Sequence, residues 1–417
     1  MNVLKRSGAD TPIALPRPRV RPIGSSSAGA VSREAWRRLA VCTGAAALLQ
    51  LDGTLITVAL PSVAHGLGVR GGSTPVVLAA YFAAYALTLL PGGVLVDRVG
   101  ARRLALLGLA LFAVGASAGA LSMSLGVLVA TRVVQGAGAG LVSPAALAGA
   151  ISGFPAERRG RALGVWGASA GMANLLGPVL GGLLTITLGW RADWWALVPL
   201  TLLAVCAIAA GLPRNMRGDG DAVVRAGVNR IVLISAFVAA LTFMVMIGSF
   251  FIAEQYLQRA AGYSPLGAST VLVLVAILVG AAAPLAGTLA DRRGERLPAT
   301  AGFLAAGLGL LVLATPGLSL QSPLMLVPMV PVGVGLGLLF VPVSRAALNA
   351  MPPASHGRVS AVLSLGRLLG AAAGAALAGL AITTHVDAAA VHHALLVACA
   401  ICLLVGIPSS ARLGATR

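Results

Sequence analysis

The sequence has very little charge for its length. Only 10% of its 417 residues are Asp, Glu, Lys or Arg, whereas a soluble globular domain carries about 25%. There is a single lysine, Lys5, and no GxxxxGK[ST] loop to hold nucleotide phosphates. All four cysteines lie in apolar runs, and the one CxxC pair, Cys399 and Cys402, has no second ligand pair beside it. These absences exclude a soluble enzyme, a secreted disulfide scaffold and a P-loop within this chain, and we expect no metal and no cofactor.

What the sequence has in excess is apolar residues, which make up 58% of the chain. A membrane-spanning helix needs about 20 of them, so this supply is enough for twelve spans. Twelve apolar runs are separated by charged or Gly/Pro breaks. They lie at roughly 38–63, 74–96, 103–122, 125–150, 161–187, 193–212, 230–256, 266–290, 297–315, 323–350, 359–384 and 390–410. The sequence therefore predicts an all-α, polytopic membrane protein embedded in the lipid bilayer.

The net charge of +18 has two readings, nucleic-acid binding or membrane topology. If the N-terminus is cytoplasmic, 24 of the 30 Lys and Arg residues fall in the tails and inner connections. This bias predicts cytoplasmic termini and an even number of spans, and it argues against a nucleic-acid partner. The excess of Arg, Ala and Gly is typical of a GC-rich bacterial genome. We therefore expect a bacterial cytoplasmic (inner) membrane protein.

The two halves of the chain repeat each other. The run from Gly93 to Arg102 follows the second span, and a matching run from Gly287 to Arg296 follows the eighth, 194 residues later. Gly138 in the fourth span matches Gly335 in the tenth, 197 residues later. Duplicated six-helix halves are typical of transporters whose substrate binds between the halves near the midplane. The expected organisation is a disordered basic tail (1–37), a six-helix bundle (38–212), a linker (213–229), a second bundle (230–410) and a short tail (411–417).

Several motifs lie at the expected spans. They are Asp52 to Pro61 in the first; Gly93, Asp97, Arg98, Gly100 and Arg102 after the second, with Asp291 and Arg292 in the repeat; Arg132 to Gly138 in the fourth; Gly177, Pro178, Gly181 and Gly182 in the fifth; and Gln255 to Leu266 and Gly366 to Gly370 in the second half. Together they resemble the major facilitator superfamily and its drug:proton antiporters. The resemblance is closest to the 14-helix type, although only twelve helices are predicted here.

Charges at membrane depth are the strongest indication of function. Each costs about 2.5–3.5 kcal/mol to insert, so it needs a partner or a role. Asp52 and Arg132 lie at similar depths from the outer face, about 15 Å and 10 Å, and are expected to meet. The resemblance implies that they couple transport to protons, whereas the alternative is a static ion pair. Glu254 is a further candidate for proton coupling, with an interfacial Glu that reaches water as the alternative.

The loop motif has a mechanical interpretation. Asp97 is expected to meet the start of the eleventh span, 355–358, and Asp291 the start of the fifth, 157–161, so that both contacts latch the inner gate. Gly93 is expected to let two backbones approach closely. The alternative is a loop that only retains positive charge on the cytoplasmic side. The glycines around Pro178 predict a close helix contact, and the resemblance adds a bend that sets the direction of export.

The predicted function is proton-coupled efflux of a small amphipathic compound, such as a drug or antibiotic, by a monomer that alternates access. Candidate substrate-cavity residues are Gln50, Thr54, Gln135, Asn174, Gln255 and Arg367. One alternative is a narrow-specificity metabolite transporter. A second is a non-transporting membrane receptor or sensor on the same scaffold.

Overall fold

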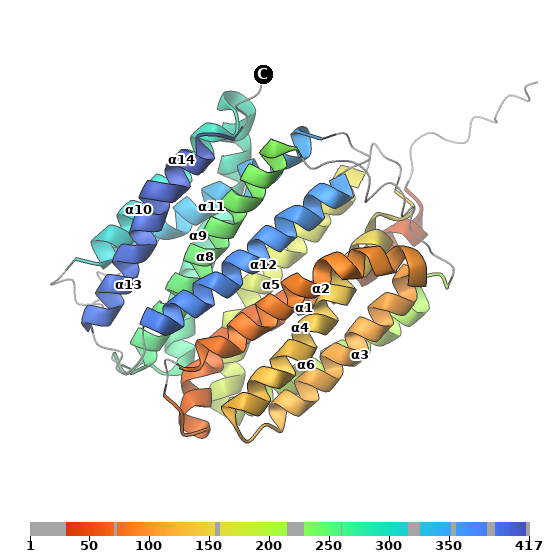
Figure 1. Ribbon diagram of the computed structural model, residues 1–417, viewed down its shortest axis with the longest axis horizontal. Helices are drawn as coiled ribbons and strands as arrows, with labels where there is room; N and C mark the ends of the chain where they lie inside the picture. The colour runs from red at the N-terminus through yellow and green to blue at the C-terminus, as the bar shows by residue number, and fades with distance from the viewer. Residues whose placement is uncertain are drawn as a thin grey trace, which may run out of the picture.

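The structure is a computed structural model that describes residues 31–70, 73–154, 159–214, 229–259, 261–315, 326–351, 356–381 and 388–413. Within these stretches all regular secondary structure is helical (Figure 1). Serine caps start several of the helices, because the Oγ of Ser32 accepts from the backbone N–H of Ala35 at 3.1 Å and that of Ser264 accepts from Gly267 at 3.1 Å. Local sequence signals therefore fix these helix starts.

The helices follow the predicted order. Those of the first half are α1 (Arg33–Gly66), α2 (Pro75–Val99), α3 (Ala101–Ala120), α4 (Leu125–Ile151), α5 (Arg159–Leu188) and α6 (Arg191–Gly211). Those of the second half are α8 (Arg230–Arg259), α9 (Pro265–Arg293), α10 (Arg296–Leu313), α11 (Leu326–Asn349) and α12 (His356–Ala381), followed by α13 (Ala388–Ala400), the π-helix η5 (Ile401–Gly406) and α14 (Ile407–Ser410). In the described part of the chain eleven segments are long and apolar enough to cross a membrane, and α5 adds a shorter apolar segment, Met172–Leu188. The predicted all-helical, multi-pass fold is confirmed.

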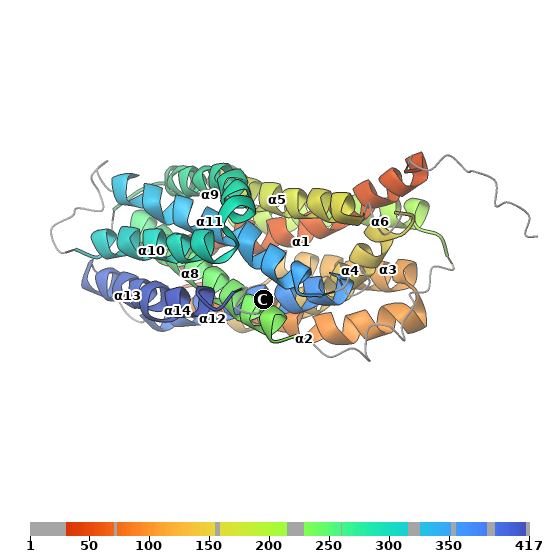
Figure 2. The same cartoon turned by 90° about the horizontal axis from the view of Figure 1, so that it is seen from above.

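The two halves form two groups of helices that lie side by side, as Figure 2 shows. The start of α1 and α14 lie at the same end of the molecule, on the upper side in Figure 1. We call this end the basic end, because the nearby connections carry Arg98, Arg102, Arg103, Arg292, Arg293 and Arg296. Between the groups α2 packs against α12 and α5 packs against α9. The sequence repeat relates α2 to α9 and α12 to α5. It therefore converts the first contact into the second, and the interface is pseudo-symmetric.

Small residues set the helix spacing in the same way in both halves. A Cβ added to Gly108 of α3 would lie 2.6 Å from the carbonyl oxygen of Gly138 on α4. The equivalent Cβ on Gly302 of α10 would lie 2.7 Å from the carbonyl oxygen of Gly335 on α11. These backbones touch because neither glycine has a side chain. The repeat seen in the sequence is therefore a repeat of packing.

The loop motif contains a glycine that its turn requires. Gly100, between α2 and α3, has a φ of 91°, and Gly294, between α9 and α10, has a φ of 78°. An L side chain rarely adopts this region. The glycines therefore let each helix end sharply at the basic end and the next one begin at once.

One packing expectation for this motif is wrong. Gly93 was expected to allow a close backbone approach, but a Cβ there would meet nothing within 4 Å. The neighbouring Gly92 makes the contact instead, because its Cβ would lie 2.6 Å from the carbonyl oxygen of Gly140 on α4. Adjacent helical residues point about 100° apart, so a shift of one position changes the face.

The Gly92 and Gly93 pair gives a direct test of this register. Gly92→Ala should lower the stability of the purified protein by about 1–3 kcal/mol, because the new methyl group overlaps backbone that cannot move aside. Gly93→Ala should leave it unchanged or raise it by up to about 1 kcal/mol, because the space beside it is open and Ala favours a helix more than Gly does. Thermal unfolding in detergent measures both, and equal melting temperatures for the two variants would contradict the assigned register.

Candidate functional site

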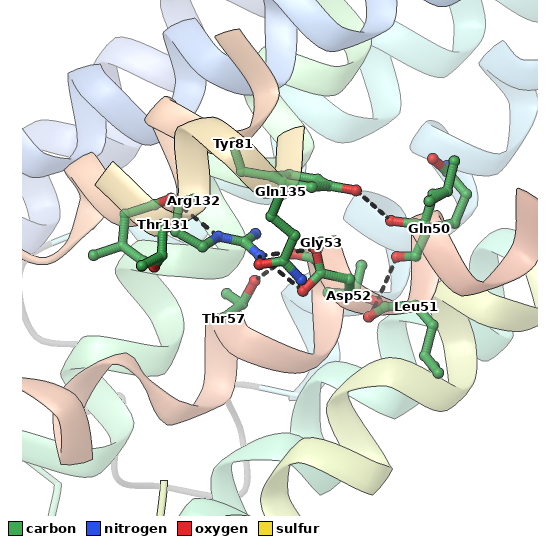
Figure 3. A network of polar contacts seen from close by, with 12 residues as sticks. Gln50, Leu51, Asp52, Gly53, Thr57, Tyr81, Thr131, Arg132 and Gln135 are labelled. Atoms are coloured by element: carbon green, nitrogen blue, oxygen red, sulfur yellow. Dashed lines mark hydrogen bonds and ion pairs between the residues drawn. The ribbon is translucent and has the colours of Figure 1, made fainter. Parts of the chain in front are cut away.

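The centre of the first half holds an ion pair that is sealed from solvent. Arg132 on α4 donates through Nη1 to both carboxylate oxygens of Asp52 on α1, each at 2.8 Å. Both side chains are 0% exposed. The contact predicted from their similar depths is therefore present, and Figure 3 shows it at the centre of a wider polar network.

Further contacts from α4 and α2 hold the guanidinium. The Oε1 of Gln135 accepts from the same Nη1 at 2.8 Å, and the carbonyl oxygen of Val77 on α2 accepts from Nε at 3.4 Å. The ring of Tyr81 lies 4.1 Å from the guanidinium carbon. Three oxygens thus face an Nη1 that carries only two hydrogens, while Nη2 has no partner. Arg132 can therefore lose one acceptor without being left unpaired.

The fold itself does not require this pair. By the 197-residue repeat, the position in the second half that matches Arg132 is Met329. The second half nevertheless packs α8, α10 and α11 in the same arrangement as α1, α3 and α4. Because a buried ion pair adds little net stability over apolar packing, its presence in one half only favours a role beyond packing.

Glu254 lies on α8, at the end of the bundle opposite the basic end, and is fully buried. Gln258 donates both to its Oε1 and, at 3.0 Å, to the carbonyl oxygen of Val58 on α1. This amide therefore links the two halves. The Oε2 of Glu254 has no partner. The alternative that Glu254 reaches water at the interface is wrong for this conformation, because the neighbouring helices cover it.

The predicted antiporter motif packs directly on the helix that carries Asp52. A Cβ on Gly177 would overlap the Oγ1 of Thr54, and one on Gly181 would overlap the carbonyl oxygen of Leu55. Both glycines, like Pro178 and Gly182 in the same stretch of α5, are buried. Any change in the bend of α5 would therefore displace α1 within one helical turn of the ion pair.

A model of the Major Facilitator Superfamily matches residues 42–375 and 232–413, which is most of the chain. The chain belongs to the Major Facilitator Superfamily. One relative is the multidrug resistance protein Stp of Mycobacterium tuberculosis, which is 27% identical over 83% of this chain and 75% of its own length. Another is the puromycin resistance protein pur8 of Streptomyces alboniger, which is 29% identical over 85% of this chain and 83% of its own length. The solved structure of a bacterial homologue of the human lysosomal transporter Spinster, in an inward-facing and occupied conformation, superposes on this chain with a TM-score of 0.76. It is 17% identical, covers 91% of this chain and 96% of its own, and supports the fold.

Two residues of the predicted gate motif in this facilitator have partners within their own half. Asp291 pairs with Arg345 of α11, within its own half. Arg102 donates at 2.7 Å to the carbonyl oxygen of Ala209 on α6, also within its own half. Arg98 and Arg292 are exposed. The predicted partner segment 157–161, the segment 355–358 and the side chain of Asp97 lie outside the residues whose contacts the structure describes, so the gate stays a prediction.

The predicted cavity residues divide into two groups. Gln50, Thr54, Asn174 and Arg367 are half-buried, as a cavity lining would be. Gln135 is not: it is fully buried and belongs to the Arg132 network, because it follows Arg132 by one helical turn. Gln255 is also fully buried, and neither of its amide atoms has a partner.

Three contributors were missed by sequence reasoning. Tyr81 fixes the α2 side of the network by donating to the carbonyl oxygen of Leu49 on α1 at 2.9 Å. Gln258 links the halves. Asp193 on α6 is fully buried, accepts from Thr185 of α5 at 2.8 Å and has a second oxygen without a partner. Asp193 could have been found as an acid within an apolar run, whereas Tyr81 gave no signal apart from its type.

Proposed function

We propose that this facilitator exports a small amphipathic compound in exchange for protons. The observation that carries the proposal is the sealed Asp52–Arg132 pair, which one half contains and the repeat does not require. The names of the relatives, which refer to multidrug and puromycin resistance, support a drug or an antibiotic as the class of substrate. The basic end would face the cytoplasm, in the orientation that the arginine distribution favours.

The coupling step follows from the contacts. A proton taken up by Asp52 neutralises the carboxylate and removes its attraction for the guanidinium. Arg132 keeps Gln135 as an acceptor, so the guanidinium retains a hydrogen bond while its counter-charge is neutralised. The released α1 can then shift against the glycines of α5, and the change of packing is passed on to the interface with α9. One charge that crosses 100 mV supplies about 2.3 kcal/mol for this cycle.

Proton counterflow in everted vesicles tests the proposal. Respiration acidifies the interior, and a panel of lipophilic cations and antibiotics is then added outside. A substrate-dependent loss of the pH gradient that disappears in Asp52→Asn is the expected result. No response to any compound, at normal expression, would contradict multidrug efflux and favour a narrow-specificity metabolite carrier or a non-transporting receptor. Thermal shifts of the purified protein across a metabolite panel would then identify a ligand, and counterflow of that ligand in the same vesicles would separate a carrier from a receptor, which binds without counterflow.

Glu254 should act as a second coupling acid. Glu254→Gln keeps an oxygen that can accept from Gln258 but cannot carry a proton, so folding should be unchanged. Substrate-driven proton flux should fall roughly tenfold, which corresponds to about 1.4 kcal/mol. Gln258→Leu is the matched control, because it removes the link to Val58 but keeps the acid. A Glu254→Gln protein with the wild-type flux between about pH 6 and pH 8 would show that this carboxyl does not couple.

A further inference from the structure

Arg367 is a deeply placed cation without a carboxylate partner. It lies on α12, about 17 Å along the helix from the basic end. Among the side chains that the structure describes, no carboxylate lies within 4 Å of its guanidinium. Its Nη2 donates to the Oγ of Ser344 on α11 at 3.0 Å, and its Nε is buried with no partner. An arginine at this depth needs a counter-charge or polar ligand, and a hydroxyl supplies only part of that.

The residues around Arg367 form an aromatic corner. Phe243 of α8 has its ring centre 5.9 Å from the guanidinium carbon. Phe340 of α11 meets Phe243 edge to face, with ring centres 5.6 Å apart. Arg367, Ser344 and both phenylalanines are half-buried. Unlike the sealed Arg132, this cation can therefore be approached by a ligand.

The backbone of Arg367 is held rigidly. Gly366 and Gly370 lie against α8, where an added Cβ would overlap the carbonyl oxygens of Ala236 and Ala240 respectively. The guanidinium therefore projects from a helix that cannot easily withdraw it. With the backbone fixed, only the side chain has to be ordered on binding, so less conformational freedom is lost.

The cluster is specific to the second half. By the 197-residue repeat, Arg367 corresponds to Ala170 and Ser344 to Leu147. The first half thus carries the matching helices without a cation or a hydroxyl at these positions. The packing shared by both halves does not explain Arg367, and Glu254 lies about 17 Å further along α8 than Phe243, which is too far to be its counter-charge.

We propose that Arg367, with Ser344 and the Phe243–Phe340 pair, binds the carboxylate of an aromatic substrate. The planar guanidinium, whose Nη2 already donates to Ser344, has further N–H groups that match the two oxygens of a carboxylate. The phenylalanine rings accept the apolar body of the same molecule. The inference rests on the proposed transport function and specifies its substrate class: an amphipathic anion, or a zwitterion whose acidic group enters the second half.

Three probes that share one aromatic body test the charge preference. They are 3-(2-naphthyl)propanoate, its primary amide and the corresponding propylamine. Binding is measured by calorimetry on the full chain in lipid nanodiscs, with empty nanodiscs as the reference for partitioning into lipid. The carboxylate should bind the wild-type protein about tenfold or more tightly than the amide, as expected for a charge-assisted hydrogen bond. The amine should bind most weakly.

Variants then test whether Arg367 causes the preference for the carboxylate over the amide. Arg367→Gln should abolish the difference between carboxylate and amide, and Arg367→Lys should retain part of it. Arg191→Gln is the matched control. Like Arg367, Arg191 lies over an aromatic ring, that of Trp190, and donates to one oxygen, the carbonyl of Ser122, but it lies in the first half. It should leave the preference unchanged. Equal binding of carboxylate and amide to the wild-type protein, which needs no variant, would overturn the proposal, as would a preference that survives in Arg367→Gln.

The counterflow assay separates this inference from the function on which it rests. If the carboxylate preference holds but no compound dissipates the pH gradient, proton-coupled efflux is wrong and the anion site stands. If lipophilic cations drive proton efflux through Asp52 and the naphthyl probes show no carboxylate preference, the anion site is wrong and the transport function stands.

Discussion

Replacing both members of the buried pair, Asp52→Asn together with Arg132→Met, should give a protein that folds with wild-type stability but no longer exchanges substrate for protons. Each single replacement leaves one charge buried without its partner, which costs about 3–5 kcal/mol. The double replacement leaves no such charge and keeps most of the volume. Its free energy of unfolding should therefore return to within about 1 kcal/mol of wild type.

This double-mutant cycle distinguishes the two readings of the pair. If the pair is only a static brace, the double variant restores both folding and transport. If it couples transport to protons, the double variant restores folding alone, because no group at this position can carry the proton. Unfolding in mixed micelles gives the stabilities, and substrate-driven proton flux in vesicles gives the coupling. A double variant with the wild-type flux would remove Asp52 from the mechanism.

The exposed pair Asp291 and Arg345 provides the control cycle. Its side chains are 66% and 34% exposed, so water screens their attraction. The coupling energy from Asp291→Asn and Arg345→Met should be below about 1 kcal/mol. A comparable value for the buried pair would mean that Asp52 and Arg132 are more hydrated than their contacts indicate.

The sequence alone predicted how deep each residue lies along its helix far better than the direction in which its side chain points. Hydropathy and the arginine pattern located the spans, and similar depth brought Asp52 and Arg132 together correctly. Direction around the helix axis depends on neighbours that a single sequence does not reveal. Gly93 was therefore chosen for the close contact that Gly92 makes, and Gln135 was assigned to a cavity although it contacts the buried arginine.

Links between the halves were the hardest to predict. The contact from Gln258 to the carbonyl oxygen of Val58 joins residues 200 positions apart. Its acceptor is a backbone oxygen, which every residue carries, so no residue type marks it. The same holds for Arg102 and the carbonyl oxygen of Ala209. Charged side chains at depth, in contrast, stand out because their burial needs an explanation.

The contact between α5 and α1 predicts a rescue that depends on which atom blocks the new methyl group. Gly177→Ala and Gly181→Ala should each lower the free energy of unfolding by about 1–3 kcal/mol or more, because each Cβ overlaps α1. At Gly177 the nearest atom is the side-chain Oγ1 of Thr54, which Thr54→Ala removes. At Gly181 it is the backbone oxygen of Leu55, which no substitution removes.

Thr54→Ala should therefore recover part of the lost stability in Gly177→Ala and none in Gly181→Ala. Thr54→Ala alone should be nearly neutral, because Oγ1 makes only long contacts to its own helix, at 3.3 Å to the carbonyl oxygen of Gln50 and 3.2 Å to that of Leu51. Gly280→Ala on α9, where a Cβ would meet nothing within 4 Å, controls for helix propensity. Rescue of both α5 variants by Thr54→Ala would mean that the helices can move apart, and that this glycine motif does not fix the distance between α5 and the helix that carries Asp52.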